Sequence, residues 1–185
     1  MVEALAVEKG GVLFLDISTR TGFCYGTLAN VEAGPVWGVW QLPSGVSVTL
    51  GARLAAFENE LADAIFEYQP AVVGIEAPMA AGAVGSAHTA ELLICLSGVA
   101  EAVTWRWARE FRRRSAQTLR AQVCGRCRVT EAESDDRIDV KEAIVKPWVV
   151  ARGWDITDNN ARDAAVGWAF EMGIRADRPK TRKAG

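Results

Sequence analysis

The stretch Val12–Thr27 reads Val-Leu-Phe-Leu-Asp-Ile-Ser-Thr-Arg-Thr-Gly-Phe-Cys-Tyr-Gly-Thr. Its first five residues form a short apolar run that ends in a carboxylate, Asp16, which is typical of a buried central strand. Residues 18–22 have turn chemistry, and an extended segment restarts at Phe23. A third extended run spans residues 35–42 and carries two tryptophans. The opening of the chain therefore predicts three strands that follow one another as a meander.

The spacing of apolar residues changes after this meander. From Leu50 to Tyr68 they recur every three or four positions, which predicts an amphipathic helix that Gln69-Pro70 ends. Residues 71–76 form another apolar run that finishes in an acid, Glu76. The Ala- and Gly-rich residues 77–85 then suit a mobile loop over a site.

The second half of the chain is predicted to be mainly helical. The predicted elements are a long helix at about 86–109, a short strand near Phe111, helices at 116–123 and 140–152 with Pro147 as a kink, and a last helix from 159 or 160 to 172, capped by Thr157-Asp158. The fold class is therefore α/β: a three-strand meander followed by α-β-α-β in one mixed sheet flanked by helices. We expect an extension at 1–10, one domain at 11–174 and a basic tail at 175–185.

Composition sets the broad class of the protein. The chain has 185 residues and 20.0 kDa, of which half are apolar and 24% are charged, and this excludes a wholly disordered chain. No apolar run approaches the ~20 residues of a membrane span, and the acidic start is unlike a signal peptide. Four cysteines and one histidine favour a reducing, cytoplasmic location over a disulfide scaffold.

Charge is divided unevenly along the chain. Residues 1–105 carry a net charge of −8 and residues 106–185 a net charge of +6, and arginine outnumbers lysine sixteen to five. The planar guanidinium suits phosphates and base edges, so the basic half is a candidate DNA-binding face. A solvated basic surface without a ligand explains the same charges.

Three acids occupy positions where an unpaired carboxylate would be costly. Asp16 and Glu76 end apolar strands, and adjacent parallel strands would bring them to one edge of the sheet. Asp163 lies in the first turns of the last predicted helix, among alanines. Oxygen ligands select hard cations such as Mg²⁺ or Mn²⁺, which would also relieve the repulsion between the acids. Taken singly, each acid is explained equally well by a helix cap or an ion pair.

The segment Phe14–Gly26 resembles the first-strand motif of RuvC-type Holliday-junction resolvases, in which an Asp is followed by a polar turn, Thr-Gly and an aromatic. Residues 53–76 are similar to that family's helix-Pro-strand-Glu segment, and Asp163-Ala-Ala is similar to the end of its last motif. The three motifs occur in the family's order and cover about residues 11–172. The resemblance implies a ribonuclease H-like fold, a homodimer, and hydrolysis of DNA strands at four-way or other branched junctions.

The resemblance also implies roles for individual residues. Asp16, Glu76 and Asp163 would be catalytic ligands of two Mg²⁺ or Mn²⁺ ions, with Lys141 near the scissile phosphate. Asn160 stands where the family usually has a second Asp or a His, and can offer a metal its carbonyl oxygen but no charge. The expected DNA-contacting residues are Arg20, Met79, Arg112, Arg113, Arg114, Arg120, Arg126 and Arg128. No membrane or small-molecule cofactor is expected, and the host would be a bacterium or a phage-infected bacterial cell.

Other interpretations remain open at this point. A junction-binding protein without catalysis would fit Asn160, and a nuclease with broader substrates such as flaps or forks would fit the same acids. An actin-like ATPase would need two lobes, which 185 residues without an internal repeat do not supply. The single Cys124-Gly-Arg-Cys127 motif lacks two further ligands at zinc spacing, so we interpret it as a reduced surface turn.

Overall fold

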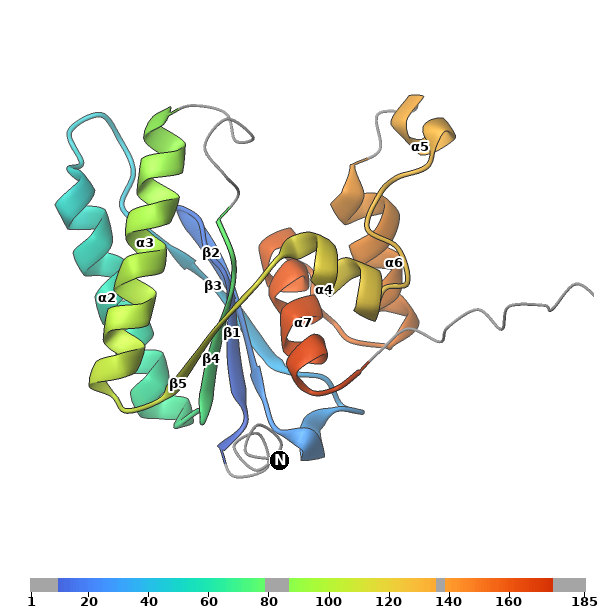
Figure 1. Ribbon diagram of the computed structural model, residues 1–185, viewed down its shortest axis with the longest axis horizontal. Coiled ribbons are helices and arrows are strands. Elements are labelled where there is room, and N and C mark those ends of the chain that lie inside the picture. The colour runs from blue at the N-terminus through green and yellow to red at the C-terminus, as the bar shows by residue number, and fades with distance from the viewer. Residues whose placement is uncertain (1–9, 79–86, 136–138, 175–185) are drawn as a thin grey trace, which may run out of the picture.

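The structure, a computed structural model, describes residues 10–78, 87–135 and 139–174. Its centre is a five-stranded mixed sheet in the order β3-β2-β1-β4-β5 (Figure 1). The strands are β1 (Val12–Asp16), β2 (Arg20–Gly26), β3 (Val36–Gln41), β4 (Val72–Glu76) and β5 (Glu110–Arg114). β1, β2 and β3 pair antiparallel, whereas β4 is parallel to both β1 and β5. The predicted meander and mixed sheet are therefore confirmed.

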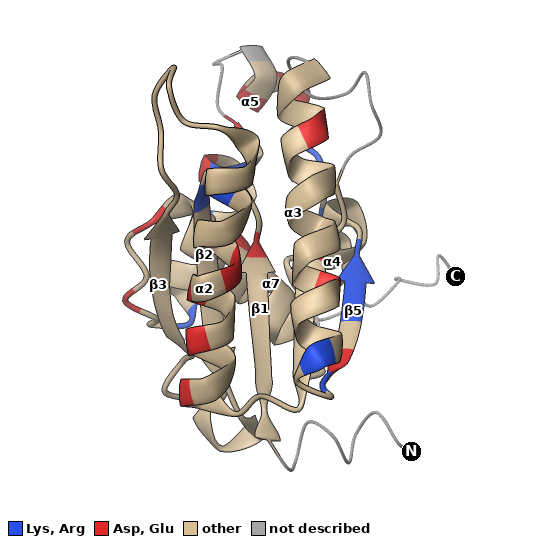
Figure 2. Ribbon diagram, turned by 90° about the vertical axis from the view of Figure 1, so that its left-hand side faces the viewer, with Lys and Arg blue, Asp and Glu red and all other residues tan. Residues whose placement is uncertain are grey.

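Helices cover both faces of this sheet. α2 (Leu50–Tyr68) and α3 (Ala87–Arg106) lie side by side on one face (Figure 2). α7 (Asn159–Glu171) crosses the other face, with α4 (Ala116–Val123) and α6 (Lys146–Ala151) beside it (Figure 1). The remaining elements are α5 (Glu131–Asp135), the 3₁₀ turn η1 (Leu28–Asn30) and the π turn η2 (Lys141–Val145). No helix in the described ranges is long and apolar enough to cross a membrane.

The alternation of side chains along β1 divides the core into two layers. Leu13 and Leu15 pack against α2 and α3, whereas Val12 and Phe14 pack against α7, and all four are fully buried. Asp16 continues the second series and therefore faces α7. The apolar run of β1 is thus explained by burial on both faces of a central strand.

Two glycines allow α7 to lie unusually close to the sheet. A Cβ atom on Gly22 of β2 would lie 2.2 Å from the backbone carbonyl carbon of Asn160, and one on Gly167 would lie 2.0 Å from the ring of Phe14. Real Cβ atoms do not approach other atoms so closely, so only glycine fits at either position. Gly22, in the Thr-Gly pair of the opening motif, therefore allows the short distance between α7 and β2.

Several element boundaries differ from those predicted. β2 begins at Arg20 within the predicted turn, because Arg20 and Thr21 already pair with Gln41 and Trp40 of β3. α3 ends at Arg106 instead of Arg109. Pro147 stands in the first turn of α6, where its missing N–H group costs nothing, and the irregularity falls on the preceding π turn. Of the predicted loop at 77–85, only residues 77 and 78 lie within the described ranges.

Candidate active site

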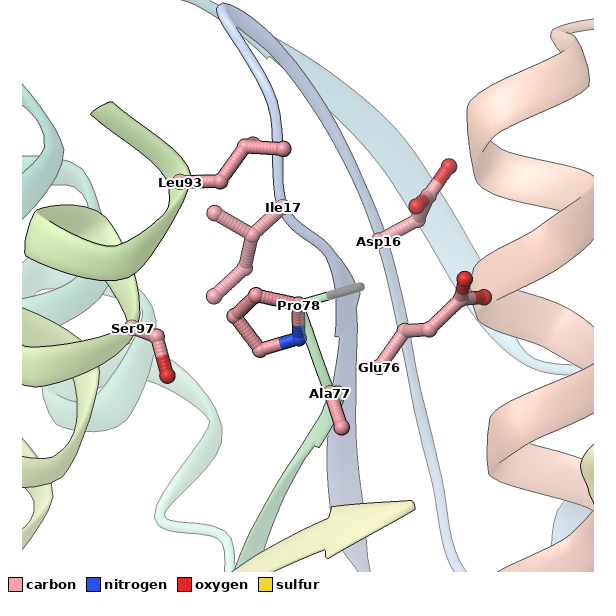
Figure 3. Close-up of a pocket in the computed structure, with 7 residues that line it drawn as sticks. All are labelled: Asp16, Ile17, Glu76, Ala77, Pro78, Leu93 and Ser97. Carbon is pink, nitrogen blue, oxygen red and sulfur yellow. The ribbon is translucent and has the colours of Figure 1, made fainter. Parts of the chain in front are cut away.

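The carboxyl ends of β1 and β4 bring two acids together. Leu15 pairs with Ile75 in the parallel register, so the next residues on the two strands, Asp16 and Glu76, are neighbours. Both carboxylates point toward α7 (Figure 3). The side chains are largely buried, with exposed fractions of 18% for Asp16 and 22% for Glu76. The strand ends therefore hold two carboxylates side by side in a poorly solvated place.

The second turn of α7 supplies the third acid, Asp163. Asp158 caps the helix, because its Oδ1 accepts hydrogen bonds from the backbone N–H groups of Asn160 (2.8 Å) and Ala161 (3.1 Å). Its Oδ2 lies 2.5 Å from Nη2 of Arg20, at the start of β2. These contacts fix the helix start over the sheet edge, and Asp163, one turn further on, is 3% exposed. The predicted cap at Asp158 is confirmed.

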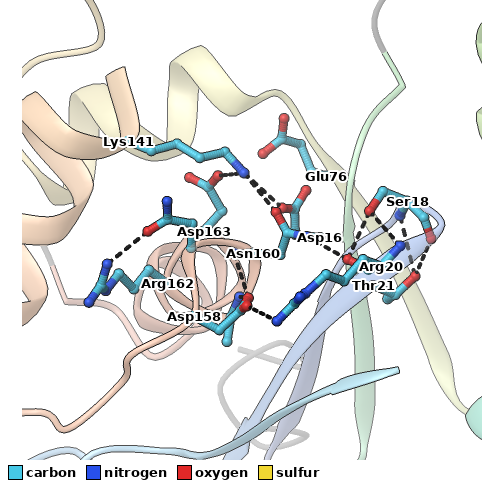
Figure 4. Close-up of polar contacts among 12 residues, drawn as sticks. Asp16, Ser18, Arg20, Thr21, Glu76, Lys141, Asp158, Asn160, Arg162 and Asp163 are labelled. Atoms are coloured by element: carbon cyan, nitrogen blue, oxygen red, sulfur yellow. Dashed lines mark hydrogen bonds and ion pairs between the residues drawn. The ribbon is translucent and has the colours of Figure 1, made fainter. Parts of the chain in front are cut away.

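Two basic side chains, Lys141 and Arg120, lie among the acids, and Figure 4 shows the contacts of Lys141. The Nζ atom of Lys141 lies 2.7 Å from Oδ2 of Asp163 and 3.4 Å from Oδ2 of Asp16. The Nη2 atom of Arg120, from α4, lies 3.1 Å from Oδ1 of Asp163 and 3.9 Å from Oε2 of Glu76. Three acids and two bases from five elements therefore form one compact cluster.

Burial governs the protonation of the strand-end acids. It raises the pKa of Asp16 from 3.8 to about 6, with the charge of Asp163 adding to the effect and Lys141 opposing it. Burial also raises the pKa of Glu76 from 4.5 to about 7, with a further contribution from the charge of Asp16. Burial lowers the pKa of Lys141, but the charges of Asp16 and Asp163 outweigh it, so that its pKa is raised. The ammonium of Lys141 is therefore held in its charged form beside Asp16 and Asp163.

The carboxylate oxygens of the cluster are of the type that binds a hard divalent cation, but their arrangement fits one only in part. Glu76 accepts no hydrogen bond from any described residue, and its ionisation is opposed by burial, as expected for an acid that lacks its cation. Lys141, however, stands among the other oxygens. Within the described ranges, no three His, Cys, Asp or Glu side chains surround a point where a metal ion could sit. Among the described residues, the nearest base to Glu76 is therefore Arg120 at 3.9 Å, whereas Asp163 is already paired with the ammonium of Lys141 at 2.7 Å.

A small cavity lies behind the acids on the α3 side of the sheet edge. It has a volume of about 160 Å³ and is lined by Asp16, Ile17, Glu76, Ala77, Pro78, Leu93 and Ser97 (Figure 3). The hydroxyl of Ser97 is buried without a hydrogen-bond partner among the described residues. Asp16 and Glu76 line this cavity, but their carboxylates point away from Leu93 and Ser97, toward α7.

The predicted DNA-contacting arginines are scattered by the fold. Arg20 lies at the rim of the acid cluster and Arg120 inside it. Arg112 is buried on β5, where it binds Glu110 (2.8 Å) and Glu171 (2.6 Å). A DNA contact by Arg112 remains a prediction, which its burial and its two acidic partners count against.

The other members of that set have varied surroundings. Arg114 binds Glu171 (2.6 Å), Arg113 binds Glu101 (2.8 Å), and Arg126 binds Glu133 (2.7 Å). Arg128 is exposed after α4, and Met79 lies outside the described residues. DNA contacts by these side chains remain predictions, now weakened for the three arginines that already have acidic partners.

Sequence reasoning missed three residues that the structure makes prominent. Glu171, at the end of α7, is 2% exposed and neutralises both Arg112 and Arg114. Lys146 and Arg162 line a shallow polar depression beside Asn160, together with Arg20. A signal for the last two was present, since Lys146 follows Lys141 by five residues and Arg162 follows Asn160 by two. No comparable local signal existed for Glu171.

Comparison with known proteins bears on the fold. No protein-family model and no curated protein matches the chain. Among solved structures, Thermus thermophilus RuvC has a TM-score of 0.61 and 12% identity over 89% of this chain and 97% of its own. T. thermophilus RuvC in complex with a Holliday junction substrate gives 0.60 and 11%, over 89% and 96%. The yeast mitochondrial Holliday junction resolvase Ydc2 gives 0.58 and 12%, over 88% and 78%. The ribonuclease H-like fold implied by the sequence motifs is therefore confirmed.

Proposed function

We propose that this protein is a divalent-metal-dependent endonuclease that cuts Holliday junctions or other branched DNA. The observation that carries the proposal is the convergence of Asp16, Glu76 and Asp163 from β1, β4 and α7 on one side of one sheet edge. The shared fold supports it, since a protein with that fold, T. thermophilus RuvC, has a structure with a Holliday junction substrate.

The acid cluster has the parts that phosphodiester hydrolysis requires. A divalent ion held by Asp16 and Glu76 would supply activation of the attacking water and stabilisation of charge on the phosphate. The chain itself supplies fixed positive charge, because Lys141 and Arg120 stand next to the acids in a poorly solvated place. Such preorganised charges are effective where negative charge develops in the transition state.

The surroundings of the cluster suit a DNA backbone. Arg20, Lys146 and Arg162 line the polar depression that adjoins Asn160. Arg20 is paired with Asp158 and Lys146 with Glu142, and both acids also line the depression, so a phosphate would have to replace them. We assign to this depression the phosphates that flank the cut, since its three basic side chains lie at the edge of the acid cluster. Arg20 keeps the role expected from the sequence, and the other two residues extend the same surface.

A homodimer would present two such sites to the two strands of a symmetric junction. On α3, the face turned away from the core carries Ile94, Gly98 and Trp105, of which Ile94 is 56% and Trp105 79% exposed. We assign this face to the contact between copies. Light scattering on the wild type and on Ile94→Glu tests it, and a wild type that is monomeric at micromolar concentration contradicts it.

A second candidate is a protein that binds junctions without cutting them. It is favoured by the ion pairs of Lys141 with Asp16 and Asp163, which a catalytic metal would have to tolerate or break. Binding and cutting are separated by one assay. Labelled four-way junctions, flaps and forks are incubated with the protein in Mg²⁺, in Mn²⁺ and in EDTA, and both cleavage and binding are measured.

The nuclease proposal expects cleavage in either metal, none in EDTA, and loss of cleavage with retained binding in Asp16→Asn. The matched control is Asp63→Asn, an exposed acid of α2 on the opposite face of the sheet, which should cut like the wild type. Binding without cleavage in both metals would favour the second candidate. The ratio of rates on junctions, flaps and forks defines the substrate.

A further inference from the structure

Lys141 is surrounded by oxygens in the way a bound cation is. Its Nζ atom donates to Oδ2 of Asp163 at 2.7 Å, to Oδ1 of Asn160 at 3.0 Å and to Oδ2 of Asp16 at 3.4 Å (Figure 4). These are three of the four side chains from which the sequence predicted two metal ions to be held. An ammonium has three N–H groups, and this one has three acceptors.

The side-chain amide of Asn160 is oriented to accept a hydrogen bond from the ammonium of Lys141. Its Nδ2 donates to the backbone carbonyl of Arg20 at 2.6 Å, which turns Oδ1 toward Lys141. The opposite orientation of the amide would place oxygen against the carbonyl and N–H against the ammonium. An aspartate could not donate to the carbonyl either, so β2 favours an amide here over a second carboxylate.

Glu76 lies outside this arrangement. No described residue donates a hydrogen bond to its carboxylate, and its nearest cation, Nη2 of Arg120, is 3.9 Å away. Oδ1 of its neighbour Asp16 is likewise without a hydrogen bond among the described residues. The cluster thus contains one position where a cation is already bound and one where oxygens still lack a cation.

We propose that the ammonium of Lys141 takes the place of one of the two expected divalent ions, so that the site binds a single divalent ion at Asp16 and Glu76. The inference rests on the proposed function only in assuming that a metal binds at all. Ionised, the three acids carry three negative charges, and Lys141 and Arg120 balance two of them. One divalent ion reverses the remaining charge, and a second would be placed next to an ammonium without an acid left to neutralise it.

The test is the stoichiometry of Mn²⁺ binding to the full-length protein without DNA. Isothermal titration calorimetry counts the ions per chain, and electron paramagnetic resonance distinguishes an isolated Mn²⁺ from a spin-coupled pair. The wild type should bind one ion with the spectrum of isolated Mn²⁺. Lys141→Met, which removes the ammonium and keeps the length of the side chain, should bind two ions and show coupling.

Arg106→Met is the matched control. Arg106 is an exposed base at the end of α3, on the opposite face of the sheet, and pairs with Glu58 of α2. This variant should bind one ion like the wild type. A gain of the second ion in both variants would overturn the proposal, because the effect would then follow from general loss of positive charge.

The remaining outcomes separate this inference from the proposed function. Two ions in the wild type, or one in Lys141→Met, overturn the inference and leave a metal-dependent nuclease intact. No ion in the wild type at millimolar Mn²⁺ overturns both. If Lys141→Met fails to fold, the ¹⁵Nζ resonance of Lys141 in the wild type decides. On addition of Mg²⁺ it should stay protected from exchange, and its loss would show that the metal displaces the lysine.

Discussion

Replacing Glu76 by glutamine should make the metal-free protein more stable, by an amount that depends on pH. Glu76 has a pKa raised from 4.5 to about 7, chiefly by burial, and accepts no hydrogen bond from a described residue. Between pH 4.5 and about pH 7, Glu76 is therefore protonated more often in the native state than in the unfolded state. The contribution of Glu76 to stability is therefore present below about pH 4.5 and is lost as the pH rises through 7.

The size of the effect follows from the shift in pKa. At about 1.4 kcal/mol per pKa unit, ionised Glu76 costs the native state about 3 kcal/mol. Glutamine has nearly the same shape and never ionises. Glu76→Gln should therefore have a higher free energy of unfolding than the wild type. This gain in stability should be about 2–3 kcal/mol larger at pH 8.5 than at pH 5.

Urea denaturation in EDTA at the two pH values measures this difference. The control is Glu60→Gln, an exposed residue of α2, whose effect should be small and alike at both pH values. An equal effect of Glu76→Gln at pH 5 and pH 8.5, or destabilisation at pH 8.5, would refute the reasoning that a buried, uncompensated charge resides on Glu76. Added Mn²⁺ should stabilise the wild type and not the variant.

Three further predictions concern the frame and the DNA surface. Glu171→Gln removes the buried carboxylate that Arg112 and Arg114 share, while Arg112 keeps its ion pair with Glu110, and should lower the free energy of unfolding by about 3–5 kcal/mol, measured in urea. Gly22→Ala should cost about 2 kcal/mol and abolish metal binding because it pushes α7 off β2, whereas Gly51→Ala on α2, whose Cβ would meet only Thr49 Oγ1 at 4.0 Å, should be neutral or stabilising. Junction affinity should fall steeply with salt, and Arg20→Gln should reduce the log–log slope by about 0.9, one phosphate contact; an unchanged slope would remove Arg20 from the DNA surface.

The parts of the fold that were predictable are those determined by local pattern. The apolar runs of β1 and β4 identify buried strands, and the alternation of side chains along them places Asp16 and Glu76 on one face. Thr21-Gly22 marks a place where the backbone is closely approached, although the sequence does not reveal that α7 is the approaching element. Position within a strand is a local property and can be read without the fold.

The charge pattern could not be interpreted in the same way. The arginine run at 112–114 suggested a DNA face, yet Glu171, at the other end of α7, neutralises two of its members. A count of charges along the chain does not show which acid the fold brings to a base. The same limit applies to Lys141, whose contacts with Asp16 and Asp163 join segments 125 and 22 residues apart.

Both ends of helix α7 are attached to strands of the sheet face that it covers. At its start Asp158 and Asn160 attach it to β2 through Arg20, and at its end Glu171 attaches it to β5. Asp163 lies between these two points of attachment. A disturbance at β5 would shift the far end of α7 and move Asp163 away from Asp16, so loss of the buried ion pairs on β5 should disrupt the acid cluster without a change to any residue in it.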